Sequence, residues 1–72
     1  MTENVNKPLS KLKELIKIRF NNQENFAQAM NLDRVTLNYK LNAFRPFTAV
    51  EIQKAIQLLN LDKKDIPLYF FN

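Results

Sequence analysis

Apolar residues recur every three or four positions along most of the chain, which is the spacing of helices that bury one face. The first stripe consists of Leu9, Leu12, Leu15, Ile16 and Phe20. It predicts a helix that has Pro8 in its first turn and ends near Asn21. The lysines of this helix, Lys11, Lys13 and Lys17, fall outside the stripe. We expect them to line a solvated face rather than an edge that contacts phosphates.

Two short helices joined by a tight turn are predicted within Asn22–Asn42. Asn22 can cap the first helix with its side-chain oxygen, and Asp33 can cap the second, which spans residues 34–42. The apolar positions of the first helix are Phe26, Ala27 and Met30. The chain contains no glycine, so Asn31 is the best tolerated residue for a left-handed helix end. The segment therefore has the pattern of a helix-turn-helix.

The second of these helices has a buried and an exposed face. Leu37 and Leu41 are predicted core residues, together with Leu32 in the turn. The opposite face consists of Arg34, Val35, Asn38, Tyr39 and Asn42. An apolar and an aromatic residue flanked by amides, here Val35 and Tyr39, can read bases, but they also make a good protein-binding surface.

A loop over residues 43–47 follows these two helices, and Pro46 fixes its backbone. Within the loop we expect Phe44 to pack inward against the core. Arg45 is expected to extend outward, where it can reach a phosphate.

The next helix is indicated at its start by two devices. Thr48 and Glu51 have the spacing of a capping box, and Phe47 and Ile52 have the spacing of a hydrophobic staple. The buried stripe of this helix consists of Ile52, Ala55, Ile56 and Leu59. Asn60 is predicted to end it.

The C-terminal segment is short and strongly apolar. Asp62 is predicted to cap a last short turn, which Pro67 prevents from extending far. The tail Leu68–Phe71 either folds back to close the core formed by the first and fourth helices or forms a dimer surface. The sequence leaves both alternatives open.

The composition limits the classes of function. The 72 residues are enough for one domain, predicted over residues 8–72 after a flexible arm at residues 1–7. Cysteine, histidine and glycine are all missing, which removes thiolate nucleophiles, the commonest metal ligand and phosphate-cradling glycine loops. We expect no enzymatic activity, no cofactor, no metal site and no small-molecule substrate.

No segment has the pattern of a membrane anchor. The longest apolar run, Ile66–Phe71, is too short to span a bilayer, and Met1–Pro8 lacks the apolar stretch of a signal peptide. We expect a cytoplasmic protein that makes no contact with membranes.

The distribution of charge argues against binding by phosphate neutralisation alone. The net charge is +4, but within the predicted helix-turn-helix Arg34 and Lys40 are balanced by Glu24 and Asp33. A protein held to DNA chiefly by phosphate contacts would normally place cations beside its recognition helix. The segment is weakly charged where such cations are expected.

The segment Asn22–Asn42 resembles the Cro/C1-type helix-turn-helix of small temperate-phage regulators. The matching residues are Gln23, Ala27 and Asn31, followed by Thr36, Leu37 and Asn38. Lys40 stands where that family usually has an apolar residue, so Leu41 is expected to take its place in the core. The opening "LKELI" and the ending "YFF" are similar to phage regulators of Gram-positive hosts. The resemblance implies an all-α fold, a compact lambda-repressor-like bundle of about five short helices containing a helix-turn-helix.

The resemblance also implies a set of binding residues. Gln23 would bond a backbone phosphate at the start of its helix. Arg34 would take guanine, Asn38 adenine, and Val35 a thymine methyl. The candidate DNA- or repressor-binding residues are Gln23, Arg34, Val35, Thr36, Asn38, Tyr39, Asn42 and Arg45.

Two functions in a lysis–lysogeny switch follow from these observations. In the favoured one, the chain resembles the modulator-of-repression or antirepressor proteins of Gram-positive phages. It would then bind the DNA-binding domain of the cognate repressor in a heterocomplex, with its own helix-turn-helix as the candidate contact. In the alternative, a Cro-like homodimer binds operator DNA through residues 34–42.

Overall fold

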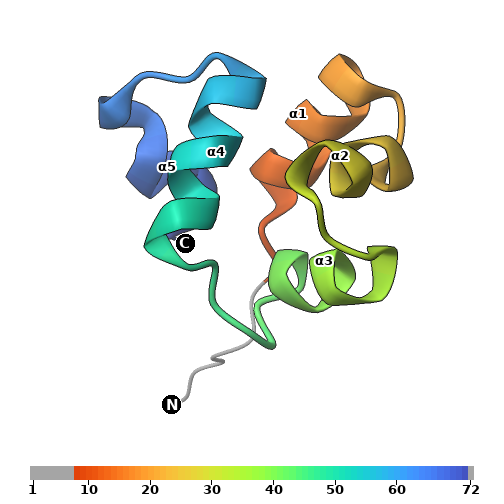
Figure 1. The fold of residues 1–72 in the computed structure, drawn as a ribbon. Helices are drawn as coiled ribbons and strands as arrows, with labels where there is room; N and C mark the ends of the chain where they lie inside the picture. Colours follow the sequence, from red (N-terminus) through yellow and green to blue (C-terminus); the bar gives the residue numbers. More distant parts are fainter. Residues whose placement is uncertain (1–7, 72) are drawn as a thin grey trace.

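The computed structural model describes residues 8–71, which form five α-helices and one 3-10 helix. The elements are α1 (Ser10–Phe20), α2 (Gln23–Met30), α3 (Arg34–Leu41), α4 (Ala49–Leu59), η1 (Lys63–Asp65) and α5 (Ile66–Phe70). Figure 1 shows α3 at one end of the molecule, followed by the loop that leads to α4. The predicted compact all-α bundle is confirmed, and the two helices expected within Asn22–Asn42 are α2 and α3. The arm predicted at residues 1–7 lies outside the described residues.

The apolar stripes predicted from the sequence meet in one core. Its buried members are Leu9, Leu12, Ile16, Phe26, Ala27, Met30, Leu37, Leu41, Ala55, Leu59 and Phe70. Fully burying one large apolar side chain contributes roughly 1.5–3 kcal/mol. Because Leu37 and Leu41 retain no exposed surface, they hold α3 against the rest of the bundle.

The caps predicted at three helix starts are confirmed. The side-chain oxygens of Asn22 and Asp33 each accept a backbone N–H of the following turn, at 2.8 Å in both cases. Thr48 and Glu51 form the reciprocal capping box at the start of α4. Asn31 has the expected left-handed backbone, with φ 61°. These bonds satisfy backbone groups that have no partner inside the helices.

Three local predictions near the chain ends are wrong. Pro8 precedes α1 instead of lying in its first turn, since Ser10 begins the helix after Leu9. Pro67 lies in the first turn of α5 and does not limit it, because a proline there removes no intrahelical hydrogen bond. The side chain of Asp62 makes no capping bond; its carbonyl closes the η1 turn by accepting the Asp65 N–H at 3.0 Å.

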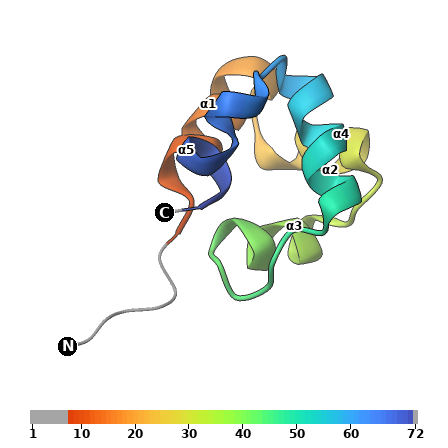
Figure 2. The same ribbon diagram turned by 90° about the vertical axis from the view of Figure 1, so that its left-hand side faces the viewer.

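The C-terminal tail folds back onto the bundle. Figure 2 shows α5 lying along α1, with which it makes contact. Phe70 is buried, and its ring meets Phe47 edge-on with centroids 5.4 Å apart. Leu68 and Phe71 remain exposed. Of the two alternatives for the tail, the fold-back is therefore right for Phe70, which packs near the entry to α4, and it leaves two apolar side chains outside.

Candidate interaction surface on α3

The solvent-facing side of α3 forms a groove together with the start of α2. Its lining residues are Gln23, Arg34, Val35, Asn38 and Tyr39, and its volume is about 300 Å³. Val35 is 59% exposed and Tyr39 is 43% exposed, as the sequence pattern predicted. The fold thus brings five of the candidate binding residues around one hollow.

The C-terminal end of α3 is tied to α1 by two hydrogen bonds. The N–H of Leu9, the residue just before α1, donates to the Leu41 carbonyl at 2.8 Å. The Lys13 ammonium donates to the Asn42 side-chain oxygen at 2.6 Å. Lys13 is therefore half-buried and engaged, whereas the sequence suggested that it would simply be solvated. These contacts fix where the groove stands relative to α1.

A buried cation ties the same end of α3 to α4. Lys40 is only 8% exposed, and its ammonium lies 2.5 Å from the Glu51 carboxylate and 5.9 Å from the centre of the Phe47 ring. Leu41 is buried as expected, but Lys40 is buried as well. The sequence gives only a weak signal for this pair, which is a lysine at a usually apolar position. Glu51 gives no further signal, because its role in the capping box already accounts for it.

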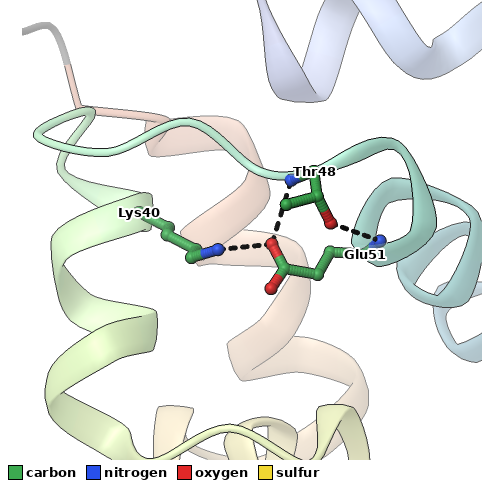
Figure 3. A network of polar contacts seen from close by, with 3 residues as sticks. All are labelled: Lys40, Thr48 and Glu51. Atoms are coloured by element: carbon green, nitrogen blue, oxygen red, sulfur yellow. Dashed lines mark hydrogen bonds and ion pairs between the residues drawn. The ribbon is translucent and has the colours of Figure 1, made fainter.

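Glu51 joins the capping box and the buried cation in one polar network (Figure 3). Its carboxylate accepts the Thr48 N–H at 3.0 Å as well as the Lys40 ammonium, and its own N–H donates to the Thr48 hydroxyl at 3.1 Å. Burial alone would raise the pKa of Glu51, but the bonds from Lys40 and Thr48 and the charge of Lys40 bring the pKa below its usual value. The carboxylate is therefore held in its ionised form.

Three predicted binding residues lie outside the groove. Thr36 is half-buried, and its N–H is engaged by the cap of α3. Asn42 is also half-buried; its side-chain amide donates to the carbonyl of Asn38 at 2.9 Å and to the side-chain oxygen of Asn38 at 3.0 Å. Arg45 lies beyond the helix, with its guanidinium carbon 5.2 Å from the centre of the Tyr39 ring. Both polar atoms of the Asn42 side chain are therefore used in intramolecular hydrogen bonds, to Asn38 within α3 and to Lys13 of α1.

Phe44 occupies a different position from the one that the sequence suggested. It is 64% exposed, not packed inward. Its N–H donates to the Tyr39 carbonyl at 2.9 Å, and its ring meets the Tyr39 ring edge-on with centroids 6.4 Å apart. Ala43 has φ 64°, and this left-handed turn brings the Phe44 N–H back to the Tyr39 carbonyl. A large apolar side chain missing from the predicted surface therefore belongs beside it.

Two kinds of feature are not found among the described residues, a metal-binding cluster and a membrane span. Within residues 8–71, no three acidic, histidine or cysteine side chains gather where they could hold a metal ion. No helix in that part of the chain combines the length and the apolar composition needed to cross a bilayer. The α3 surface itself combines two arginines, amides and exposed apolar side chains, which is a composition suited to recognition of a macromolecule.

The structure is similar to a solved phage protein. It matches the solution structure of the modulator of repression (MOR) of the temperate bacteriophage TP901-1 from Lactococcus lactis with a TM-score of 0.79 and 40% sequence identity. The match covers 93% of this chain and 90% of that chain. A comparison with curated proteins gave no match. The fold is therefore that of a small all-helical phage regulator.

A family model assigns the chain more narrowly. The family described as "Protein of unknown function (DUF739)" matches residues 8–72. The chain belongs to this family, and the TP901-1 modulator of repression is a solved structure to which it is similar over nearly its whole length.

Proposed function

We propose that this chain modulates repression in the lysis–lysogeny switch of a temperate phage, in the cytoplasm of the bacterial host and without enzymatic activity. It binds the DNA-binding domain of the cognate repressor and thereby changes or blocks repression. The observation that carries the proposal is the 40% identity, over 93% of the chain, to a phage modulator of repression.

The proposed contact is the exposed face of α3. In this proposal α2, the turn and α3 are a Cro/C1-type helix-turn-helix whose recognition surface has become a protein-binding surface. The exposure of Val35 and Tyr39 supports it, since apolar and aromatic anchors carry much of the energy of protein interfaces. The balanced charge of the segment supports it too, because phosphate binding requires an excess of cations.

One observation favours operator DNA as a second candidate ligand. Gln23, Arg34 and Asn38 line the same groove, and these side chains can contact a phosphate, a guanine and an adenine. In that case a homodimer would place α3 of each copy in successive major grooves.

A gel shift on switch-region promoter DNA separates these functions. The samples are this protein alone, the repressor of the same phage alone, and the two together. We expect no shift by this protein alone, and loss or change of the repressor's band on mixing. A shift by this protein alone that weakens with rising salt, while the repressor's band stays unchanged on mixing, would support the Cro-like function instead.

Two substitutions locate the contact on α3. We expect Val35→Asp and Tyr39→Ala to abolish the effect on the repressor while the fold stays intact, because both side chains are exposed. The matched control is Val50→Asp, which introduces the same charge at a 74% exposed valine on α4. Full activity of both α3 variants would rule out this surface as the contact.

A further inference from the structure

Three helices of this glycine-free chain end in the same kind of turn. The left-handed residues are Asn31 after α2, Ala43 after α3 and Asn60 after α4, with φ 61°, 64° and 56°. In each turn the next residue donates its N–H to a carbonyl of the helix at 2.9 Å; the pairs are Leu32 to Ala27, Phe44 to Tyr39 and Leu61 to Ile56. Such a turn usually places an apolar side chain against the last turn of its helix.

The turn after α3 differs from the other two in both of its residues. Leu32 and Leu61 are half-buried and pack against the core, whereas Phe44 is 64% exposed. The other two turns use asparagine at the left-handed position, which tolerates it well, but this turn uses Ala43, whose β-carbon disfavours it. A less favourable backbone thus holds an aromatic ring in solvent, and such combinations concentrate at functional sites.

The exposed ring is part of a preorganised group, which we name the Tyr39–Phe44–Arg45 cluster. The rings of Tyr39 and Phe44 form a T-shaped pair with an interplanar angle of 82°, and the guanidinium of Arg45 lies over the Tyr39 ring. Aromatic side chains and arginine are the residues most enriched at interface hot spots. The contacts among these side chains reduce the conformational freedom that would be lost on binding.

Arg45 indicates the chemistry of the partner. Within residues 8–71, Lys40 forms an ion pair with Glu51, whereas Arg45 is paired with no carboxylate. The guanidinium of Arg45 contacts the Tyr39 ring instead. A guanidinium that contacts a ring face keeps N–H donors free for a planar acceptor, and a carboxylate can accept two of them at once. Next to an exposed phenylalanine, the complementary surface is an apolar pocket with a carboxylate at its edge.

We propose that the Tyr39–Phe44–Arg45 cluster anchors this chain to the repressor, with Phe44 seated in an apolar pocket and Arg45 paired with a carboxylate at its edge. The inference rests on the proposed function, since it takes the repressor as the partner. It extends the contact beyond the groove residues of α3 to the loop that follows, and it assigns a protein carboxylate to Arg45 in place of a DNA phosphate.

Isothermal titration calorimetry with the repressor's DNA-binding domain tests the anchor. Phe44→Ala is expected to weaken binding at least about tenfold, as truncation of a hot-spot side chain does. The control is Ile18→Ala, which truncates an apolar side chain that is 72% exposed on α1, beside Leu68 and Tyr69, and it should change affinity by less than about twofold. Thermal melts establish that each variant is folded.

Substitutions of Arg45 test the carboxylate. Arg45→Glu should weaken binding more than Arg45→Gln, and Arg45→Lys should recover only part of the affinity because an ammonium lacks the bidentate geometry. Arg19→Gln, at an exposed arginine of α1, is the control. If the Arg45 variants weakened a DNA gel shift and left repressor binding unchanged, Arg45 would bind phosphate and the inference would be overturned.

The outcomes separate this inference from the proposed function. Loss of binding by Tyr39→Ala and Val35→Asp, with Phe44→Ala behaving as Ile18→Ala does, would overturn the anchor and leave the function standing. Failure of the unsubstituted protein to bind the repressor would overturn both.

Discussion

The two long sides of α3 face different surroundings. Leu37 and Leu41 have no exposed surface and Lys40 is tied to α4, whereas Val35 and Tyr39 on the other side are open to solvent. The buried side is specified by packing and by a polar network, while the open side makes few contacts that the fold needs. The position of the surface and its chemistry are therefore set by different residues, so each can be changed without the other.

The largest expected loss of folding stability comes from a substitution on the buried side of α3. Leu37→Ala should lower the free energy of unfolding by about 2–5 kcal/mol, because it removes a large side chain from a closed core. Val35→Ala, two residues earlier on the open side, should change it by less than about 0.5 kcal/mol. Urea denaturation followed by circular dichroism measures both. Equal losses would mean that the two sides of α3 do not differ in the way described.

The sequence predicts what repeats along the chain and misses what depends on distant partners. Apolar spacing and side-chain caps gave the helices, since both act within one or two turns. The burial of Lys40 requires Glu51 from another helix, and no local pattern states that the two meet. The exposed Phe44 follows a left-handed alanine, a backbone conformation that propensity argues against. The five residues gathered in the groove were predictable because helical spacing alone places four of them on one side of α3.

The next effect in size concerns the buried cation. Lys40→Ala should lower the free energy of unfolding by about 1–3 kcal/mol, because it leaves the Glu51 carboxylate in a poorly solvated place without its cation. This loss of stability should be smaller than the loss caused by breaking a fully buried ion pair, because Glu51 still accepts the hydrogen bond from the Thr48 N–H. Chemical denaturation measures it. The control is Lys54→Ala, at an exposed lysine of α4.

The pH dependence of stability shows whether Glu51 is the group affected. Its pKa is lower in the folded chain than the usual 4.5, so the unfolded chain binds the proton more readily. The stabilisation is therefore complete above that value and is lost as the pH falls through the lower pKa of the folded state. In Lys40→Ala this acid-dependent loss should shrink, because the hydrogen bond and the charge of Lys40 that lower the pKa have gone. An unchanged acid profile would assign the dependence to other carboxylates.

The smallest expected effect on the free energy of unfolding comes from the turn between α3 and α4, where a substitution should stabilise the fold. Ala43→Gly should raise the free energy of unfolding by about 0.5–1 kcal/mol, since relief at a left-handed β-carbon outweighs the added freedom of the unfolded chain. Asn31→Ala, at the equivalent position after α2, should lower it by a similar amount. Denaturation of both variants in parallel tests the pair, and destabilisation by Ala43→Gly would mean that this turn carries no strain. If Ala43→Gly instead gives a more stable protein that binds the repressor less tightly, the alanine is retained for the position of Phe44 and not for the fold.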